Sequence, residues 1–159
     1  MGRSEVGREA NKFMMQYREF FDGKRVIDFG CGRVPYHQDF FHYKEYIPID
    51  KAIDGTNITK RMDVRGDCGI CFAVLEHCRD PVSAMRNIRE CIGEGHLLLA
   101  VSIKYALHML PDDYYRFTPE FWRVVEDCGF SVVDKSEVFG KGLDGQDSSM
   151  LVMLCKGEA

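Results

Sequence analysis

Residues 26–32 read Val-Ile-Asp-Phe-Gly-Cys-Gly, an apolar run that contains one acid and ends in two glycines around a single residue. This pattern predicts a buried parallel strand that turns sharply into a loop. Gly30 and Gly32 lack the Cβ atom that would keep a ligand away from the backbone. The segment therefore predicts a strand followed by a ligand-binding loop.

A second acid, Asp50, closes the apolar stretch 46–49, twenty residues after Gly30. An acid at the end of the second strand is placed to accept hydrogen bonds from the two hydroxyls of a ribose. Together the two segments predict a site for a nucleoside-containing cofactor. The alternative is an ordinary strand–turn–helix unit, in which the glycines serve only to reverse the chain.

The residues around the glycine pair favour S-adenosylmethionine over a dinucleotide. A dinucleotide site uses the pattern Gly-x-Gly-x-x-Gly, whereas Pro35 stands here in place of the third glycine. The carboxylate of Asp28, two residues before the first glycine, would repel a pyrophosphate and attract an ammonium group. S-adenosylmethionine carries an amino acid zwitterion on a ribose and has no phosphate. A nicotinamide-dependent reductase is a further hypothesis, opposed by the missing glycine.

Length and charge are those of a compact enzyme. The 159 residues predict one domain, with an N-terminal helix over residues 1–23 and an α/β core over 24–159. A formal net charge of -4 indicates no bulk attraction for nucleic acid. The apolar runs are too short to span a bilayer, and residues 1–12 contain no signal-peptide core. We therefore expect a cytoplasmic protein.

Cysteine usage agrees with that location. Seven cysteines without a secretion signal predict reduced thiols. Cys68 and Cys71 form a single C-x-x-C pair, whereas a tetrahedral zinc site usually takes its four ligands from two such pairs. Cys71 also lies in an apolar run, where cysteine behaves as a small buried hydrophobe. We expect no metal site.

The rest of the chain alternates between helical and strand patterns. Helices are expected over 5–21, 35–41, 80–92 and 118–128, and strands over 25–29, 45–50, 58–64, 69–75, 96–103, 130–138 and 150–156. This order predicts an α/β fold with a mainly parallel sheet and helices on both faces. The sheet has seven strands, or six, because segment 58–64 is poorly patterned. Ligands bind such sheets beyond the carboxyl ends of the strands, where the glycine loop and Asp50 fall.

From Arg25 to Lys156 the chain resembles the class I S-adenosylmethionine-dependent methyltransferases, of the small kind called methyltransferase type 11. The segments that carry the resemblance are VIDFGCG at 26–32, ID at 49–50, AVLEHCRDP at 73–81, and DYYRFTPE at 113–120 with CGF at 128–130. The resemblance implies a Rossmann-like fold whose last strand is antiparallel. It also implies S-adenosylmethionine as cofactor and an EC 2.1.1 activity.

The resemblance further implies which residues bind the cofactor. The first motif would cradle the methionine part, with Phe72 and Ala73 passing near its chain. Asp50 would hold the ribose and Lys51 would lie beside the adenine. The residues of the first motif in these roles are Asp28, Gly30, Cys31 and Gly32.

The adenine amino group has two candidate partners. Asp67 matches the acid that meets this group in the resembling proteins. However, only Cys68 separates Asp67 from Gly69, where relatives usually have about ten residues, and Asp63 is therefore the alternative. The short connection also predicts an open cofactor pocket.

His77 is the candidate catalytic residue. It follows the fourth expected strand, and an imidazole pKa near 6.5 suits proton transfer from an acceptor. The alternative is that Glu76 and His77 brace the following helix. His108, Tyr115 and Arg116 are candidates for an acceptor pocket, with Arg116 pairing with an acidic substrate. The alternative for the last two is that they pin their loop onto the sheet.

The sequence thus predicts an S-adenosylmethionine-dependent methyltransferase for a small-molecule acceptor, with no nucleic acid as partner and no membrane span. A homodimer is a further expectation. The alternative is a methyltransferase-like binding or scaffold module whose short Asp67–Gly69 connection has cost it activity. Turnover separates the two hypotheses.

Overall fold

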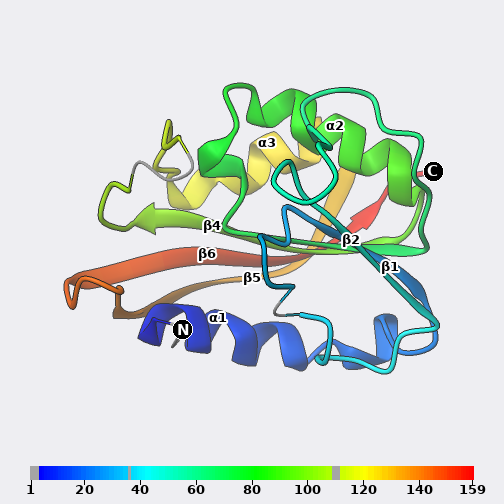
Figure 1. Ribbon diagram of the computed structural model, residues 1–159. Coiled ribbons are helices and arrows are strands. Elements are labelled where there is room, and N and C mark those ends of the chain that lie inside the picture. The colour runs from blue at the N-terminus through cyan, green and yellow to red at the C-terminus, as the bar shows by residue number, and fades with distance from the viewer. Residues whose placement is uncertain (1–3, 36, 109–111) are drawn as a thin grey trace.

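One mixed sheet forms the centre of the computed structural model, which describes residues 4–35, 37–108 and 112–159 (Figure 1). The described residues form six strands in the order β2-β1-β3-β4-β6-β5. The strands are β1 Arg25–Phe29, β2 Glu45–Ile49, β3 Cys68–Phe72, β4 His96–Lys104, β5 Phe130–Lys141 and β6 Asp147–Gly157. Strands β1 to β4 pair in parallel, whereas β6 pairs antiparallel with both β4 and β5. The predicted α/β fold and its antiparallel last strand are confirmed.

Helices cover both faces of the sheet (Figure 1). Helix α1 packs against β5 and β6 on one face, and α2 and α3 lie on the other. The α-helices are α1 Glu5–Met15, α2 Pro81–Ile92 and α3 Trp122–Asp127, and the short 3-10 helices are Arg18–Phe20, Leu75–His77 and Pro119–Phe121. The expected helix over 5–21 is therefore split in two. Within the described residues, no helix is long and apolar enough to cross a membrane.

The ends of these helices follow from local sequence. The Ser4 hydroxyl accepts a hydrogen bond from Gly7 N and caps α1. The Asp80 carboxylate does the same for Ser83 N at the start of α2, where Pro81 takes the first helical position. Gly93, with a φ of +55°, ends α2 in a backbone conformation that favours glycine.

Side chains of β4 alternate between the two halves of the core. Leu97, Leu99 and Val101 belong to the cluster on the side of α2 and α3. Leu98 and Ala100 belong to the clusters on the side of α1. This alternation is the period-2 pattern of a strand that is buried on both faces. It makes β4 the central element of the fold.

The described residues form six strands and not seven, because segment 58–64 forms turns and loop. The expectation of a seventh strand is wrong. Ile58 and Met62 are instead buried in the core cluster on the side of α2. Strand β2 is left at the edge of the sheet, and Gly30 N donates to the carbonyl oxygen of Ile49. The Ile49 carbonyl therefore points toward β1. Because the backbone groups of successive residues in a strand point to opposite sides, those of Pro48 point to the open edge, where proline has no N–H to offer another strand.

The expected helix over 35–41 is also wrong. Residues 37–39 form turns, and residue 36 lies outside the described residues. Apolar contacts still anchor the segment, because the rings of Phe41 and Phe21 stack with centroids 5.2 Å apart. The face of the sheet beside α1 is therefore covered partly by loop.

Candidate functional site

The candidate site lies at the carboxyl edge of the parallel strands. Gly30, Asp50 and Ala73 directly follow β1, β2 and β3. Because these strands are parallel neighbours, their carboxyl ends meet at one edge. The fold thereby brings together three segments that are far apart in the sequence.

Backbone hydrogen bonds join the glycine loop to the end of β2. Gly30 N donates to Ile49 O at 2.8 Å, and Gly32 N donates to Asp50 Oδ2 at 2.9 Å. The other carboxylate oxygen, Asp50 Oδ1, accepts from Ala52 N at 2.7 Å. The two predicted binding segments are thus held in direct contact, and both oxygens of Asp50 already accept backbone hydrogen bonds. Lys51 follows as an exposed turn residue.

The two glycines of the loop serve different needs. Both have a positive φ, +71° at Gly30 and +72° at Gly32. A Cβ at Gly30 would lie 2.5 Å from Val74 Cγ1, so close packing requires a glycine at this position. A Cβ at Gly32 would meet no atom within 4 Å. The bare backbone that can approach a ligand is therefore at Gly32.

Between the two glycines, Cys31 is buried. Burial, followed by the charges of Asp28 and Asp50, raises the pKa of its thiol to about 12. A thiol with this pKa stays protonated near neutral pH, and the thiolate is the reactive form. Cys31 therefore contributes packing and backbone rather than chemistry.

Asp28 is enclosed by two side chains that the sequence does not point to. Its Oδ2 atom lies 3.1 Å from His37 Nδ1 and also accepts a hydrogen bond from the Tyr46 hydroxyl. The His37 ring in turn contacts Phe72, with ring centroids 5.3 Å apart. Asp28 thus lies at the centre of a buried polar cluster. His37 was missed because it lies nine residues further along, in a loop without periodicity.

Asp67 lies at the opposite end of the parallel strands, where their amino ends meet. It precedes β3, and its Oδ2 accepts a hydrogen bond from Arg25 N, at the start of β1, at 2.8 Å. The prediction that Asp67 contacts adenine is wrong, because the amino end of β3 cannot meet a ligand at the carboxyl edge. Asp63, the alternative, is exposed in the segment that replaces the seventh strand.

A strained residue directly follows strand β3. Ala73 has a φ of +54°, and it is the one non-glycine residue with positive φ in the described parts of the chain. Its N–H donates to Ala100 O at 2.9 Å, which ties this conformation to the neighbouring strand β4. Such backbone conformations are costly and cluster at functional sites. Ala73 therefore marks this end of β3 as a place to look for ligand contacts.

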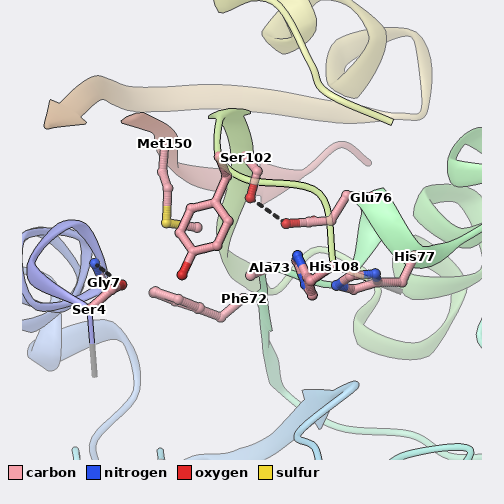
Figure 2. Close-up of a pocket in the computed structure, with 10 residues that line it drawn as sticks. Ser4, Gly7, Phe72, Ala73, Glu76, His77, Ser102, His108 and Met150 are labelled. Carbon is pink, nitrogen blue, oxygen red and sulfur yellow. Dashed lines mark hydrogen bonds between the residues drawn. The ribbon is translucent and has the colours of Figure 1, made fainter. Parts of the chain in front are cut away.

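A pocket of about 150 Å³ opens beside Ala73 (Figure 2). One wall comes from Phe72 and Ala73, and the opposite side from Ser102 of β4 and Met150 of β6. Ser4 and Gly7 of the α1 start lie at one end, and the remaining lining residues are Glu76, His77, Tyr105 and His108. His77 and His108, predicted separately, are thus brought into one pocket.

The rings of His77 and His108 are in edge-to-face contact. Their ring centroids are 4.8 Å apart, at an interplanar angle of 78°. His77 Nδ1 lies 2.7 Å from the carbonyl oxygen of Asp112, and His108 Nδ1 lies 3.2 Å from that of Ala106. A carbonyl oxygen only accepts, so Nδ1 carries the proton in both rings. In the neutral form, Nε2 of each ring is then free to accept a proton.

Tyr115 and Arg116 hold the loop before α3 in place. The Tyr115 hydroxyl donates to Arg79 O at 2.9 Å. Arg116 pairs with Asp113 through two hydrogen bonds of 2.5 and 2.7 Å, and its other contacts are to backbone carbonyls. These bonds involve all three guanidinium nitrogens. The structure therefore favours the alternative in which both residues pin the loop, and neither lines the pocket.

Sequence reasoning gave Glu76 only a bracing role. It is fully buried, and its Oε1 accepts a hydrogen bond of 2.5 Å from the Ser102 hydroxyl. Its backbone oxygen accepts from Tyr114 N at 2.8 Å, which ties Glu76 to the loop before α3 and not to the following helix α2. The side chain nevertheless forms part of the pocket wall, and no described residue donates to Oε2. In the sequence, the position of Glu76 directly before His77 was the feature that could have pointed to it.

The cysteines form no group with a metal-binding arrangement. Within the described residues, no cluster of three or more His, Cys, Asp or Glu side chains could hold a metal ion. All seven cysteines are buried and unpaired, and Cys71 lies inside β3.

Comparisons with known proteins define the class of fold. The N-methyltransferase NodS from Bradyrhizobium japonicum WM9, solved with S-adenosyl-L-homocysteine, superposes with a TM-score of 0.76 over 98% of this chain and 89% of its own, at 14% identity. The YcgJ protein from Bacillus subtilis gives a TM-score of 0.69 over 96% of this chain and 99% of its own, at 12% identity. The chain therefore has the class I methyltransferase fold.

The same fold is found in a protein named for another reaction. The [4+2]-cyclase SpnF superposes with a TM-score of 0.68 over 95% of this chain and 80% of its own, at 10% identity. No protein-family model and no curated sequence matches the chain. At these identities the fold is shared, and the reaction must be argued from the site.

Proposed function

We propose that this protein is an S-adenosylmethionine-dependent methyltransferase for a small-molecule acceptor. One observation carries the proposal: the open backbone at Gly32, held against Asp50, lies at the same sheet edge as a pocket that contains His77. The Gly32 backbone beside Asp50 is suited to a nucleoside cofactor, and the pocket is suited to an acceptor. Proteins of this fold have been solved with S-adenosylhomocysteine, which supports the choice of cofactor.

The residues present fit this cofactor better than a dinucleotide. Asp28 lies buried beside the glycine loop, and a buried carboxylate there opposes a pyrophosphate. Gly32 leaves space for close approach, and Asp50 lies at the end of β2, where a ribose would be held. When bound, S-adenosylmethionine supplies a methyl group whose bond to sulfur breaks with the electron pair remaining on sulfur.

The chain's own contribution is positioning and proton transfer. The pocket walls of Phe72, Ala73 and Met150 exclude water and orient an acceptor. His77 Nε2 accepts the proton that the acceptor loses, because Nδ1 is held by the carbonyl of Asp112. The Ala73 conformation, tied to Ala100, keeps this end of β3 in place.

Calorimetric titration with S-adenosylhomocysteine tests the cofactor site. The parent protein is expected to bind, and Asp50→Ala to lose at least about tenfold in affinity, since two backbone contacts and a ribose contact depend on that carboxylate. Asp127→Ala, an exposed acid on α3, is the matched control and is expected to bind like the parent. Circular dichroism checks that every variant is folded. A folded parent that does not bind would refute the proposal.

The binding or scaffold module remains the second candidate function. It is favoured by the order of the described strands, in which β2 is an open edge beside the proposed cofactor site. Binding of S-adenosylhomocysteine without methyl transfer to any acceptor in a broad screen would support it. The expected cytoplasmic location and the homodimer stay predictions, for which cell fractionation and sedimentation are the tests.

A further inference from the structure

Glu76 is a buried acid with an incomplete set of hydrogen bonds. Its side chain is 0% exposed, and the Ser102 hydroxyl donates to Oε1 only. Among the described residues no donor reaches Oε2. A buried carboxylate oxygen without a donor costs free energy, because it has lost its water and gained no partner.

The nearby cation does not compensate this acid. Arg116 acts on Glu76 through its charge, but hydrogen bonding to Asp113 is the largest cause that raises the pKa of the guanidinium. The Asp113 side chain is buried beside it, so the two charges of that pair balance each other. All three nitrogens of Arg116 already donate to Asp113 or to backbone oxygens. Arg116 therefore has no further donor for Glu76, and the Oε2 atom of Glu76 is left for a ligand of the pocket.

The rest of the pocket wall suits a cation. Phe72 and Tyr105 supply aromatic rings, whose faces attract an ammonium group. Met150 adds a polarizable sulfur. His77 and His108 can each accept a proton at Nε2, as their Nδ1 contacts require. Figure 2 shows Glu76, His77 and His108 on the same side of the pocket, opposite Ser4 and Gly7.

We propose that the pocket binds the amine end of the acceptor, with Glu76 accepting an N–H and His77 taking the proton that makes the nitrogen nucleophilic. This inference rests on the proposed function and names its substrate class. A primary ammonium group enters, one proton passes from nitrogen to His77 Nε2, and one of the two N–H bonds that remain on the neutral nitrogen is held by the carboxylate. A cavity of about 150 Å³ holds a group the size of one six-membered ring, so the rest of a larger acceptor lies outside.

Two probes of equal shape test the proposal on the parent protein without any variant. Benzylamine and benzyl alcohol differ only in the group that would meet Glu76. With saturating S-adenosylhomocysteine present, NMR titration is expected to show benzylamine binding at least about tenfold more tightly than the alcohol, because a charged hydrogen bond is lost with the alcohol. Equal affinity for the two probes, or no binding of either, would overturn the proposal.

A variant then assigns the preference to one side chain. Glu76→Gln keeps the size and the acceptor for Ser102 but removes the charge, and it is expected to abolish the preference for benzylamine. Glu94→Gln, an exposed glutamate after α2, is the control and is expected to keep it. Persistence of the preference in folded Glu76→Gln would show that another group selects the amine.

Binding of S-adenosylhomocysteine separates this inference from the proposed function. If the folded parent does not bind S-adenosylhomocysteine, the methyltransferase proposal fails. If it binds, and the two probes bind equally, only the amine proposal fails. If Glu76→Gln loses affinity for S-adenosylhomocysteine instead of for benzylamine, the carboxylate belongs to the cofactor site and the amine proposal is wrong.

Discussion

Gly30 and Val74 lie so close together that a Cβ atom at Gly30 would be 2.5 Å from Val74 Cγ1 and 2.6 Å from Cγ2. Gly30 follows β1 and Val74 lies just beyond β3. The contact therefore joins the first and third strands at the edge where the cofactor is proposed to bind. It explains why the first glycine of the motif is needed even without a ligand.

The two glycines of the loop allow a matched stability test. Gly30→Ala combines a positive φ with a clash and is expected to lower the free energy of unfolding by about 2–4 kcal/mol. Gly32→Ala has the same positive φ without a clash and is expected to cost about 1 kcal/mol. Urea denaturation measures both, and Val74→Ala is expected to restore part of the loss in Gly30→Ala. Equal losses in the two single variants would contradict the packing argument.

Gly32→Ala is also expected to weaken binding of S-adenosylhomocysteine, because its Cβ enters the open space beside Asp50. A loss of about tenfold corresponds to a modest overlap with the ligand. Isothermal titration of the folded variant is the measurement. Unchanged affinity would place the ligand away from this backbone.

Stability is expected to fall in acid partly through Asp113. Hydrogen bonds from Arg116 are the largest cause that lowers the pKa of Asp113, to about 2. In the unfolded chain an aspartate has a pKa of about 3.9, so the stabilisation of the fold by ionised Asp113 is fully present well above that pH. As pH falls from about 4 toward about 2, the unfolded state binds its proton first and stability is lost.

Comparison with Asp113→Asn isolates this effect. The asparagine cannot ionise, so its urea midpoint is expected to lie below that of the parent at pH 7. The gap should narrow as pH falls from 5 to 3, because only the parent loses the contribution of an ionised Asp113. A gap that is constant over this range would show that Asp113 does not retain a low pKa.

The ring tautomer of His77 is accessible to NMR. The contact with Asp112 O requires the proton on Nδ1 in the neutral ring, which leaves Nε2 as the base. Long-range proton–nitrogen correlation spectra are expected to show this tautomer for His77 and His108. Exposed His42 serves as the comparison. A proton on Nε2 of neutral His77 would remove it as the proposed proton acceptor.

Local patterns were enough to predict most of the fold. The run at 26–32, the acid after β2 and the Asp80-Pro81 start of α2 each depend on neighbours within a few residues. All six strands that the described residues form were expected. Segment 58–64 misled the prediction, because Ile58 and Met62 pack against the α2 side of the core as loop residues.

The candidate site could be predicted only in part. Gly30, Gly32, Asp50 and His77 were found because each lies directly after an expected strand or in a recognisable motif. The adenine contact predicted for Asp67 was wrong, because the short connection places this residue at the amino end of β3. Tyr115 and Arg116 were ambiguous, since a side chain that pins a loop and one that binds a substrate look alike in a sequence.

The sequence by itself determined the order of helices and strands and the glycine loop, because periodicity, caps and backbone freedom act over short distances. Only the tertiary structure decided that Glu76 Oε2 has no donor among the described residues, that His37 meets Asp28 and that Arg116 is already paired. Such outcomes depend on which side chains from distant segments fill the same space. Glu76 and Ser102 lie 26 residues apart, and no local pattern links them.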